Sequence, residues 1–271
     1  MKYLAVIFFV FSFSSVFSKQ DSIPNIKKNR VSLDISGGAS YFYLRDEGMS
    51  YLIYKGYNFT GNTRLLIENK KAKQAVNISA HTGNLQNKRF PQNRSQVSNL
   101  RLDVEYYYLR KIHQLNFLPI DLYLGGSFYT FGNLRTHNRY GNNAYNYDVS
   151  SGLNISFLAD YPFELFKRKF KLNYRALSPF YAYNVRPSFA SSLPSGFLDQ
   201  SGSNFKDAVS SGHHATVNKF FRWNNEFELQ FYLKNNNAIK LTYIWDYYQM
   251  NDIHLVQVAT HSLLIGTMFK F

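Results

Sequence analysis

The stretch FRWNNEFELQFYLKNNNAIKLTYIWDY, residues 221–247, decides the fold. Apolar side chains occupy every second position of its two halves, with one interruption at Asn225, and polar side chains such as Glu226 and Glu228 lie between them. A period of two places these sets on opposite faces of a β-strand. The apolar face is aromatic and the other face is ionised, which is typical of a strand with lipid outside and a polar interior.

The same alternation recurs about ten times between residue 30 and residue 271. We therefore predict an all-β protein, a transmembrane antiparallel up-and-down β-barrel of about ten strands, with eight or twelve as alternatives. A secreted soluble β-sandwich is the competing fold. It would expose an aromatic face of nearly every strand to water, which promotes aggregation.

Connections of alternating length support the barrel, because such barrels have long outer loops and short periplasmic turns. Both chain termini would then face the periplasm. In the strand predicted to run from Phe170 towards Val185, Pro179 predicts a bulge or a strand end that protrudes beyond the lipid. The long connections are predicted at 45–61, 83–98, 132–146 and 186–218, and the short ones at 69–73, 110–119, 159–168 and 235–237.

The first 18 residues have the features of a secretory signal peptide: Lys2, an apolar run, and a small residue at Ser18. Residues 19–29 are predicted to form a periplasmic tail, and 30–271 the barrel. The net charge of +14 would suit a nucleic-acid-binding protein. Export through the signal peptide argues against that function and predicts an integral protein of the outer membrane of a Gram-negative cell.

Charged side chains on the polar strand faces are nearly balanced in sign. A ten-stranded interior is narrow, and unpaired charges in it would be costly, so we predict a mostly plugged lumen. Basic side chains in the connections, including Arg135 and Arg186, are expected to meet phosphates of lipid or lipopolysaccharide. The predicted lumen network consists of Arg101, Asp103, Glu105, Arg175, Arg222, Glu226, Glu228 and Asp246.

Aromatic side chains on the apolar faces predict a belt in contact with lipid. His261 is predicted to lie at the outer membrane interface. The belt consists of Tyr106, Tyr108, Trp223, Phe227, Tyr243, Trp245, Phe269 and Phe271.

Weak catalytic candidates lie in the connections that we assign to the outer side: His213, His214, Asp252 and His254. An Asp–His pair could activate water there, and convergence of these histidines with Asp252 or Asp46 would favour an enzyme. No spacing of Cys or His indicates a metal site, and we predict neither a metal nor a cofactor.

The terminal strand alternates through Leu263, Ile265 and Phe269 and ends at Phe271. With the leader and the aromatic faces, it resembles bacterial outer-membrane β-barrel proteins. That resemblance implies recognition of this strand by the barrel-assembly machinery. The composition, rich in Asn, Lys, Phe and Tyr, resembles barrels of the Bacteroidota. The site motifs of omptin-type proteases and of lipid A deacylases are not found; His214-Ala215-Thr216 departs from the His-x-Ser arrangement of the latter.

Three functions remain open at this stage. The main hypothesis is a non-enzymatic outer-membrane barrel whose long extracellular loops serve surface interaction or membrane stabilisation. The alternatives are a narrow channel for small solutes and a hydrolase acting on lipid A or peptides. The expected partners are outer-membrane lipids and lipopolysaccharide, the barrel-assembly machinery, and a surface or periplasmic protein, but no nucleic acid.

Overall fold

The computed structural model describes residues 30–89, 96–114, 119–137, 144–187, 212–252 and 254–271. The predicted signal peptide and N-terminal tail, 1–29, lie outside these residues. Among the described residues, no helix is long and apolar enough to cross a membrane. The strands are β1 (Arg30–Asp46), β2 (Ser50–Glu68), β3 (Ala72–Gln86), β4 (Gln96–Gln114), β5 (Asp121–Thr136), β6 (Tyr145–Leu165), β7 (Arg168–Val185), β8 (His213–Ala215), β9 (Phe220–Tyr232), β10 (Ala238–Met250) and β11 (Val256–Lys270).

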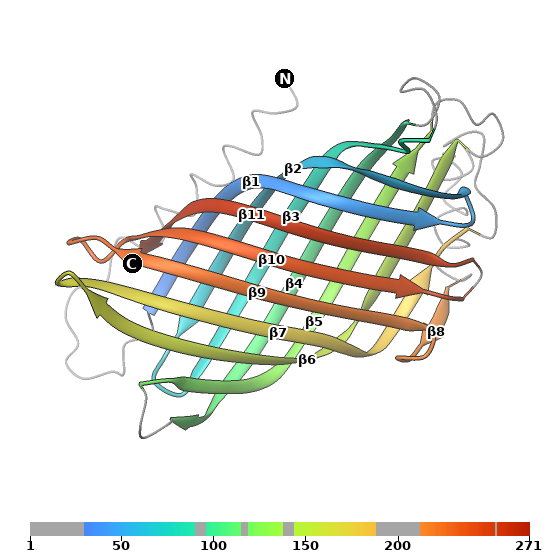
Figure 1. Cartoon of the computed structure of the whole chain (residues 1–271). Coiled ribbons are helices and arrows are strands. Elements are labelled where there is room, and N and C mark those ends of the chain that lie inside the picture. The colour runs from blue at the N-terminus through green and yellow to red at the C-terminus, as the bar shows by residue number, and fades with distance from the viewer. Residues whose placement is uncertain (1–29, 90–95, 115–118, 138–143, 188–211, 253) are drawn as a thin grey trace, which may run out of the picture.

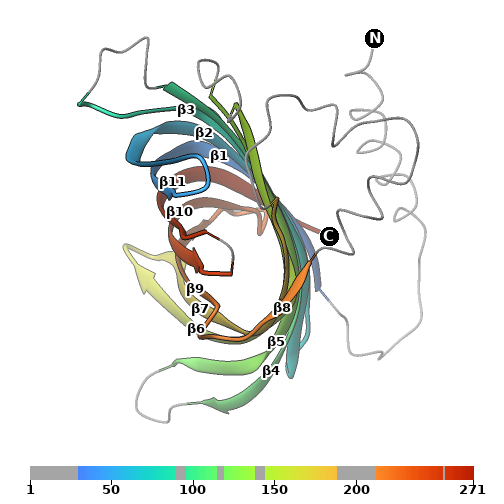
Figure 2. The same cartoon turned by 90° about the vertical axis from the view of Figure 1, so that its right-hand side faces the viewer.

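Ten of these strands form one closed antiparallel barrel (Figure 1). The order around the wall is β6-β5-β4-β3-β2-β1-β11-β10-β9-β7, and pairing of β6 with β7 closes the ring. Figure 2 shows the ring along its axis, from the end where β1 joins β2. The short β8 pairs with the end of β7 beyond the stretch that pairs with β9. The predicted ten-stranded barrel is confirmed.

The two faces of each strand meet different surroundings, as β4 illustrates. Its Leu102, Val104 and Tyr106 are exposed on the outer surface, whereas Arg101 and Glu105, at alternate positions, are buried. The exposed outer side chains are apolar and the buried inner ones are ionised, the reverse of a water-soluble barrel. The predicted orientation of the faces therefore holds in this strand.

The strands are longer than the alternation predicted, so several predicted loop boundaries are wrong. The connection predicted at 45–61 is only the turn between Asp46 and Ser50, because β1 and β2 extend to these residues. In the β2 part of this stretch, Leu52 and Tyr54 belong to an apolar layer inside the barrel while Tyr51 and Ile53 are exposed on the outer face. With apolar residues on both faces the period of two disappears from the sequence, and the strand was not recognised there.

The bulge predicted at Pro179 is present in β7. Asn154 of β6 pairs with Pro179, but the next residue, Leu153, pairs with Tyr181, so Phe180 is the extra residue. Proline donates no backbone hydrogen bond, and a bulge accommodates it without leaving a gap in the ladder. The proline thus lies within the barrel wall rather than at a protruding strand end.

Gly38 in β1 lies against the backbone of β11. A Cβ at this position would meet the Leu263 carbonyl oxygen at 2.0 Å, whereas a Cβ at Gly61 of β2 would meet nothing within 4 Å. We expect Gly38→Ala to lower the free energy of unfolding by about 1–3 kcal/mol, because the backbone must shift. Gly61→Ala should leave it unchanged or slightly higher. Urea unfolding in detergent micelles measures both, and equal stabilities would contradict the close approach.

Candidate functional site

The middle of the lumen is crossed by a cluster of two arginines and two aspartates. Arg101 of β4 donates to Asp246 of β10 at 2.6 Å and to Asp103 at 2.8 Å. Arg222 of β9 donates to Asp246 at 2.9 Å and to Asp103 at 3.2 Å. Four strands separate β4 from β10 in either direction around the ring, so these contacts join opposite walls.

A second group of ion pairs lies next to this cluster. Arg64 of β2 contacts both Glu226 and Glu228 of β9, the latter at 3.2 Å. Arg175 of β7 contacts Glu226 at 3.2 Å and Glu105 of β4 at 2.9 Å. All eight residues predicted for the lumen network therefore lie in these two groups. Arg64, which is not among those eight, is an additional member of the second group.

Lys240 of β10 adds a third connection. Its ammonium nitrogen lies 2.6 Å from Asp34 of β1 and 2.6 Å from Glu228. All three side chains are at most 3% exposed. Buried charges are tolerated where each has an opposite partner, and every member of these groups has at least one.

Empty space within this network is small. The cavity between its side chains measures about 60 Å³ and is lined by both Arg101 and Arg175. That volume holds a few water molecules. It is not a continuous aqueous path of the kind found in barrels with 16–18 strands.

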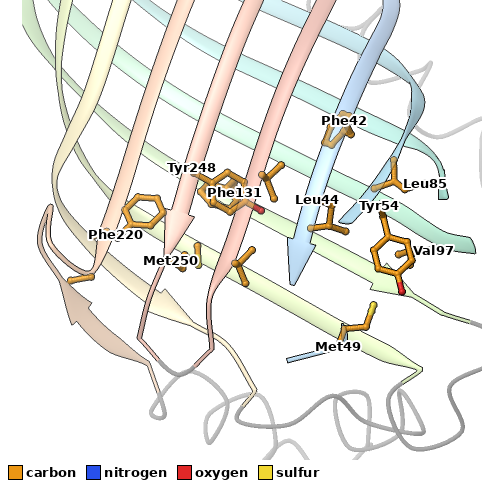
Figure 3. Packing of buried hydrophobic residues seen from close by; sticks show 14 of the residues in the cluster. Phe42, Leu44, Met49, Tyr54, Leu85, Val97, Phe131, Phe220, Tyr248 and Met250 are labelled. Carbon is orange, nitrogen blue, oxygen red and sulfur yellow. The ribbon is translucent and has the colours of Figure 1, made fainter. Parts of the chain in front are cut away.

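An apolar layer closes the barrel beyond the ion pairs, towards the end where β1 joins β2 (Figure 3). Phe131, Phe220 and Tyr248 contact one another there, and the Arg101 guanidinium carbon lies 5.1 Å from the centre of the Phe131 ring. The sequence did not predict this layer, because we expected only polar side chains inside. The members shown with labels are Phe42, Leu44, Met49, Tyr54, Leu85, Val97, Phe131, Phe220, Tyr248 and Met250.

The β1–β2 turn is fastened to the inside of the barrel by Asp46. Its carboxylate accepts hydrogen bonds from Arg135 of β5, from Arg186 beyond β7, and from Asn146 of β6 at 2.8 Å. Met49 of the same turn is buried in the apolar layer. The prediction that Arg135 and Arg186 face lipopolysaccharide is wrong, because both guanidinium groups are buried in ion pairs. Phe131 and Arg135 lie four residues apart in β5, so both side chains are on the inner face of the strand. Continuing the alternation to Arg135 predicts this direction.

At the opposite end the barrel opens into a cavity of about 900 Å³, which we call the vestibule. It is lined by the first residue of β1, the last of β11, and the short turns that join β2 to β3 and β6 to β7. Short turns and both ends of the barrel sequence mark the periplasmic side of outer-membrane barrels.

The catalytic candidates divide into separate places. His214 is exposed and lies 2.6 Å from the Tyr181 hydroxyl, on the outer face of β7 and β8, and its ring contacts Tyr183 edge-on. Asp252 accepts from Asn184 at 3.2 Å and lies 3.8 Å from Lys219.

The other candidates do not complete a site. The His254 carbonyl oxygen accepts from Arg186, and Asp46 is occupied by its two arginines. His213 is an exposed residue of β8 that pairs with Asn184, the residue whose amide donates to Asp252. Among the described residues, no hydrogen bond or ion pair joins His213 or His214 to Asp252 or Asp46. The described residues also hold no group of three or more His, Cys, Asp or Glu side chains that could bind a metal ion.

The predicted belt residues lie on the outside of β4, β9, β10 and the C-terminal end. Trp245 is half-buried and the other seven are exposed. Asn225, which interrupts the apolar face of β9, accepts a hydrogen bond from the Tyr174 hydroxyl at 2.7 Å. This bond satisfies the amide oxygen on an otherwise apolar surface. His261 also lies on the outer face, 2.8 Å from the Tyr243 hydroxyl.

No family model and no curated protein matches this sequence. Among solved structures, the outer membrane protease OmpT of Escherichia coli matches with a TM-score of 0.55 and 7% identity, over 93% of this chain and 99% of that one. Neisserial surface protein A gives 0.37 and 9%, over 88% and 97%. The transport unit of the autotransporter AIDA-I of Escherichia coli gives 0.39 and 10%, over 95% and 96%. With its apolar outer surface and ionised interior, this chain has the fold of a ten-stranded bacterial outer-membrane β-barrel, and that membrane is its location.

Proposed function

We propose that the protein is a sealed, non-enzymatic outer-membrane barrel that acts through surface contacts or membrane stabilisation and does not conduct solutes. The observation that carries this proposal is the occupied lumen: ion pairs join opposite walls, and an apolar layer lies beyond them. A small solute would have to separate buried ion pairs, and breaking such a pair costs about 3–5 kcal/mol.

The outer end of β2 supports a role in surface contact. Tyr51 and Ile53 are exposed there, and Tyr51 is 78% exposed. At the same end of the barrel polar side chains lie nearby on the outer face: Arg45 of β1 opposite Ile53, Gln86 of β3 and Gln257 of β11. Apolar groups that protrude above a polar ring are candidates for contact with another molecule.

Lipid partners are expected lower on the barrel wall. Lys55 of β2 lies 4.8 Å from the centre of the Tyr43 ring, and Tyr41 packs on Tyr57 beside it. Cations next to aromatic side chains are common where a barrel meets lipid headgroups. We propose that Lys55 meets a phosphate of lipopolysaccharide. We also propose that the barrel-assembly machinery recognises β11 with the exposed terminal Phe271.

Conductance measurements test the sealed lumen directly. The purified protein, inserted in a planar lipid bilayer, is expected to give no stepwise current at moderate voltage. Insertion is verified separately by protection of the barrel from protease in liposomes, and a porin with 16–18 strands serves as the conducting control. Reproducible steps from the parent protein would establish the channel alternative instead.

The hydrolase alternative receives no support from its candidate residues. His214 contacts tyrosines on the outer face, whereas Asp252 contacts Asn184 and Lys219. A base and the group that orients it must lie within hydrogen-bonding reach, which these contacts do not provide.

A further inference from the structure

The vestibule at the periplasmic end carries a large excess of positive charge. Ten cationic and four acidic side chains line it, a net charge of +6. Its volume of about 900 Å³ lies within the range of small-molecule binding sites. The cations are Arg30, Lys70, Lys73, Lys111, Lys167, Arg168, Lys169, Lys171, Lys234 and Lys270, and the acids are Glu68, Asp121, Asp160 and Glu164.

Most of the acidic groups are already paired with lysines deep in the vestibule. Asp160 contacts Lys73 and lies 2.9 Å from Lys171, and Asp121 lies 2.6 Å from Lys111. Glu68 is 3.7 Å from the same Lys73. The other seven cations have no carboxylate within 4 Å in the described part of the chain, so the positive charge is concentrated towards the opening.

One of these unpaired cations, Lys270, is oriented by an aromatic side chain. Lys270 lies 4.4 Å from the centre of the Tyr232 ring, and the Tyr232 hydroxyl donates to Gln230 at 2.6 Å. Contact with an aromatic face orients an ammonium group without neutralising its charge. A ligand that reaches Lys270 therefore meets a cation that has already lost part of its conformational freedom.

The β6–β7 turn projects further cations at the edge of the vestibule. Phe166 and Lys167 form a two-residue hairpin loop, with φ of 51° and 58°. Gly or Asn is favoured at such positions, and a side chain like that of lysine is strained there. Lys167 is nevertheless present, followed directly by Arg168 and Lys169. Strained positions often carry a functional group, which agrees with a ligand-binding role for this turn.

We propose that the vestibule binds a soluble anion of the periplasm that carries two or more phosphate groups. A concave site lined by one sign of charge concentrates anions of the opposite sign. A single exposed ion pair contributes little, so a ligand needs several charged groups to engage several lysines together. The inward-facing Lys73, Asp160 and Lys171 line the cavity, so it reaches into the mouth of the barrel, which favours a soluble ligand over a lipid headgroup.

Calorimetric titration with inorganic tripolyphosphate tests the proposal, with the whole barrel in a zwitterionic detergent. We expect saturable binding of one anion per barrel and an affinity at least tenfold higher than that for orthophosphate. Lys167→Gln/Lys169→Gln should weaken binding at least tenfold. Lys88→Gln/Arg89→Gln removes the same charge from exposed positions beyond β3, at the other end, and should leave the affinity unchanged.

Three results would overturn the proposal. The first is a lack of saturation with tripolyphosphate. The second is an equal loss of affinity in the two double variants, because net charge alone would then account for binding. The third is tight binding of a poly-glutamate peptide without binding of tripolyphosphate, which would identify an acidic protein segment as the ligand. Heat-dependent gel migration verifies that each variant is folded before it is titrated.

Discussion

Glu226→Ala is expected to lower the free energy of unfolding by about 3–5 kcal/mol, the cost of breaking a buried ion pair by removing one partner. Glu226 contacts Arg64 and Arg175 from two other strands of the wall. Without the carboxylate, Arg64 keeps only Glu228 and Arg175 keeps only Glu105. Each of these two buried cations then has one carboxylate partner instead of two. Urea unfolding in detergent micelles measures the loss, with tryptophan fluorescence as the signal.

Glu164→Ala is the matched control for this substitution. Glu164 is exposed at the edge of the vestibule, so removal of its carboxylate should change the stability by less than about 0.5 kcal/mol. Glu226→Gln, which keeps two hydrogen-bonding atoms, should fall between the parent and Glu226→Ala. If both alanine variants were equally stable, the ion pairs across the lumen would contribute little, and the seal would depend on the apolar layer.

Arg135→Ala is expected to cost a similar amount, about 3–5 kcal/mol, and to release the β1–β2 turn. Arg135 is fully buried and contacts Asp46 at the end of β1 and Asp148 of β6. Its removal leaves Asp148 without an ion-pair partner among the described residues and leaves Asp46 with Arg186 alone. The turn should then open locally more often, which hydrogen exchange at residues 46–50 would report as loss of protection.

Arg45→Ala provides the comparison within the same turn. Arg45 pairs with Glu47 at 2.7 Å, but its side chain is 40% exposed. Exposed ion pairs contribute about 0–1 kcal/mol, so this variant should be close to the parent in stability and in exchange. Equal effects of Arg45→Ala and Arg135→Ala would show that burial of the Asp46 contacts does not hold the turn.

The period-two pattern was sufficient to predict the barrel, because lipid outside and charge inside impose opposite chemistry on successive residues. In β9, Phe227 and Leu229 face outward while Glu226 and Glu228 face inward, and this is readable without any tertiary information. The ten strands followed from counting such segments. The inward direction of the eight predicted lumen charges follows from the same alternation: seven lie between two apolar residues, and Glu226 lies between Asn225 and Phe227.

Alternation failed where both faces of a strand are apolar. Leu52 and Tyr54 of β2 belong to the inner apolar layer, while the neighbouring Tyr51 and Ile53 lie on the outer face. Nothing in the sequence distinguishes these two environments, so the alternation predicts a loop where the outer end of β2 lies. A related reason applies to Arg135. The predicted connection at 132–146 ends the preceding strand too early, so the alternation is not continued to Arg135 and does not place it on the inner face.

Which charges meet was decided only by the tertiary structure. The sequence by itself determined that Arg101 and Asp246 face inward, but their contact depends on the tilt and stagger with which ten strands close. That stagger sets which residues of opposite walls lie at the same height along the axis. The same closure brings the lysines of separate turns into one vestibule, although they are far apart along the chain. Strand pattern is a local property, whereas proximity across a closed ring is a property of the whole barrel.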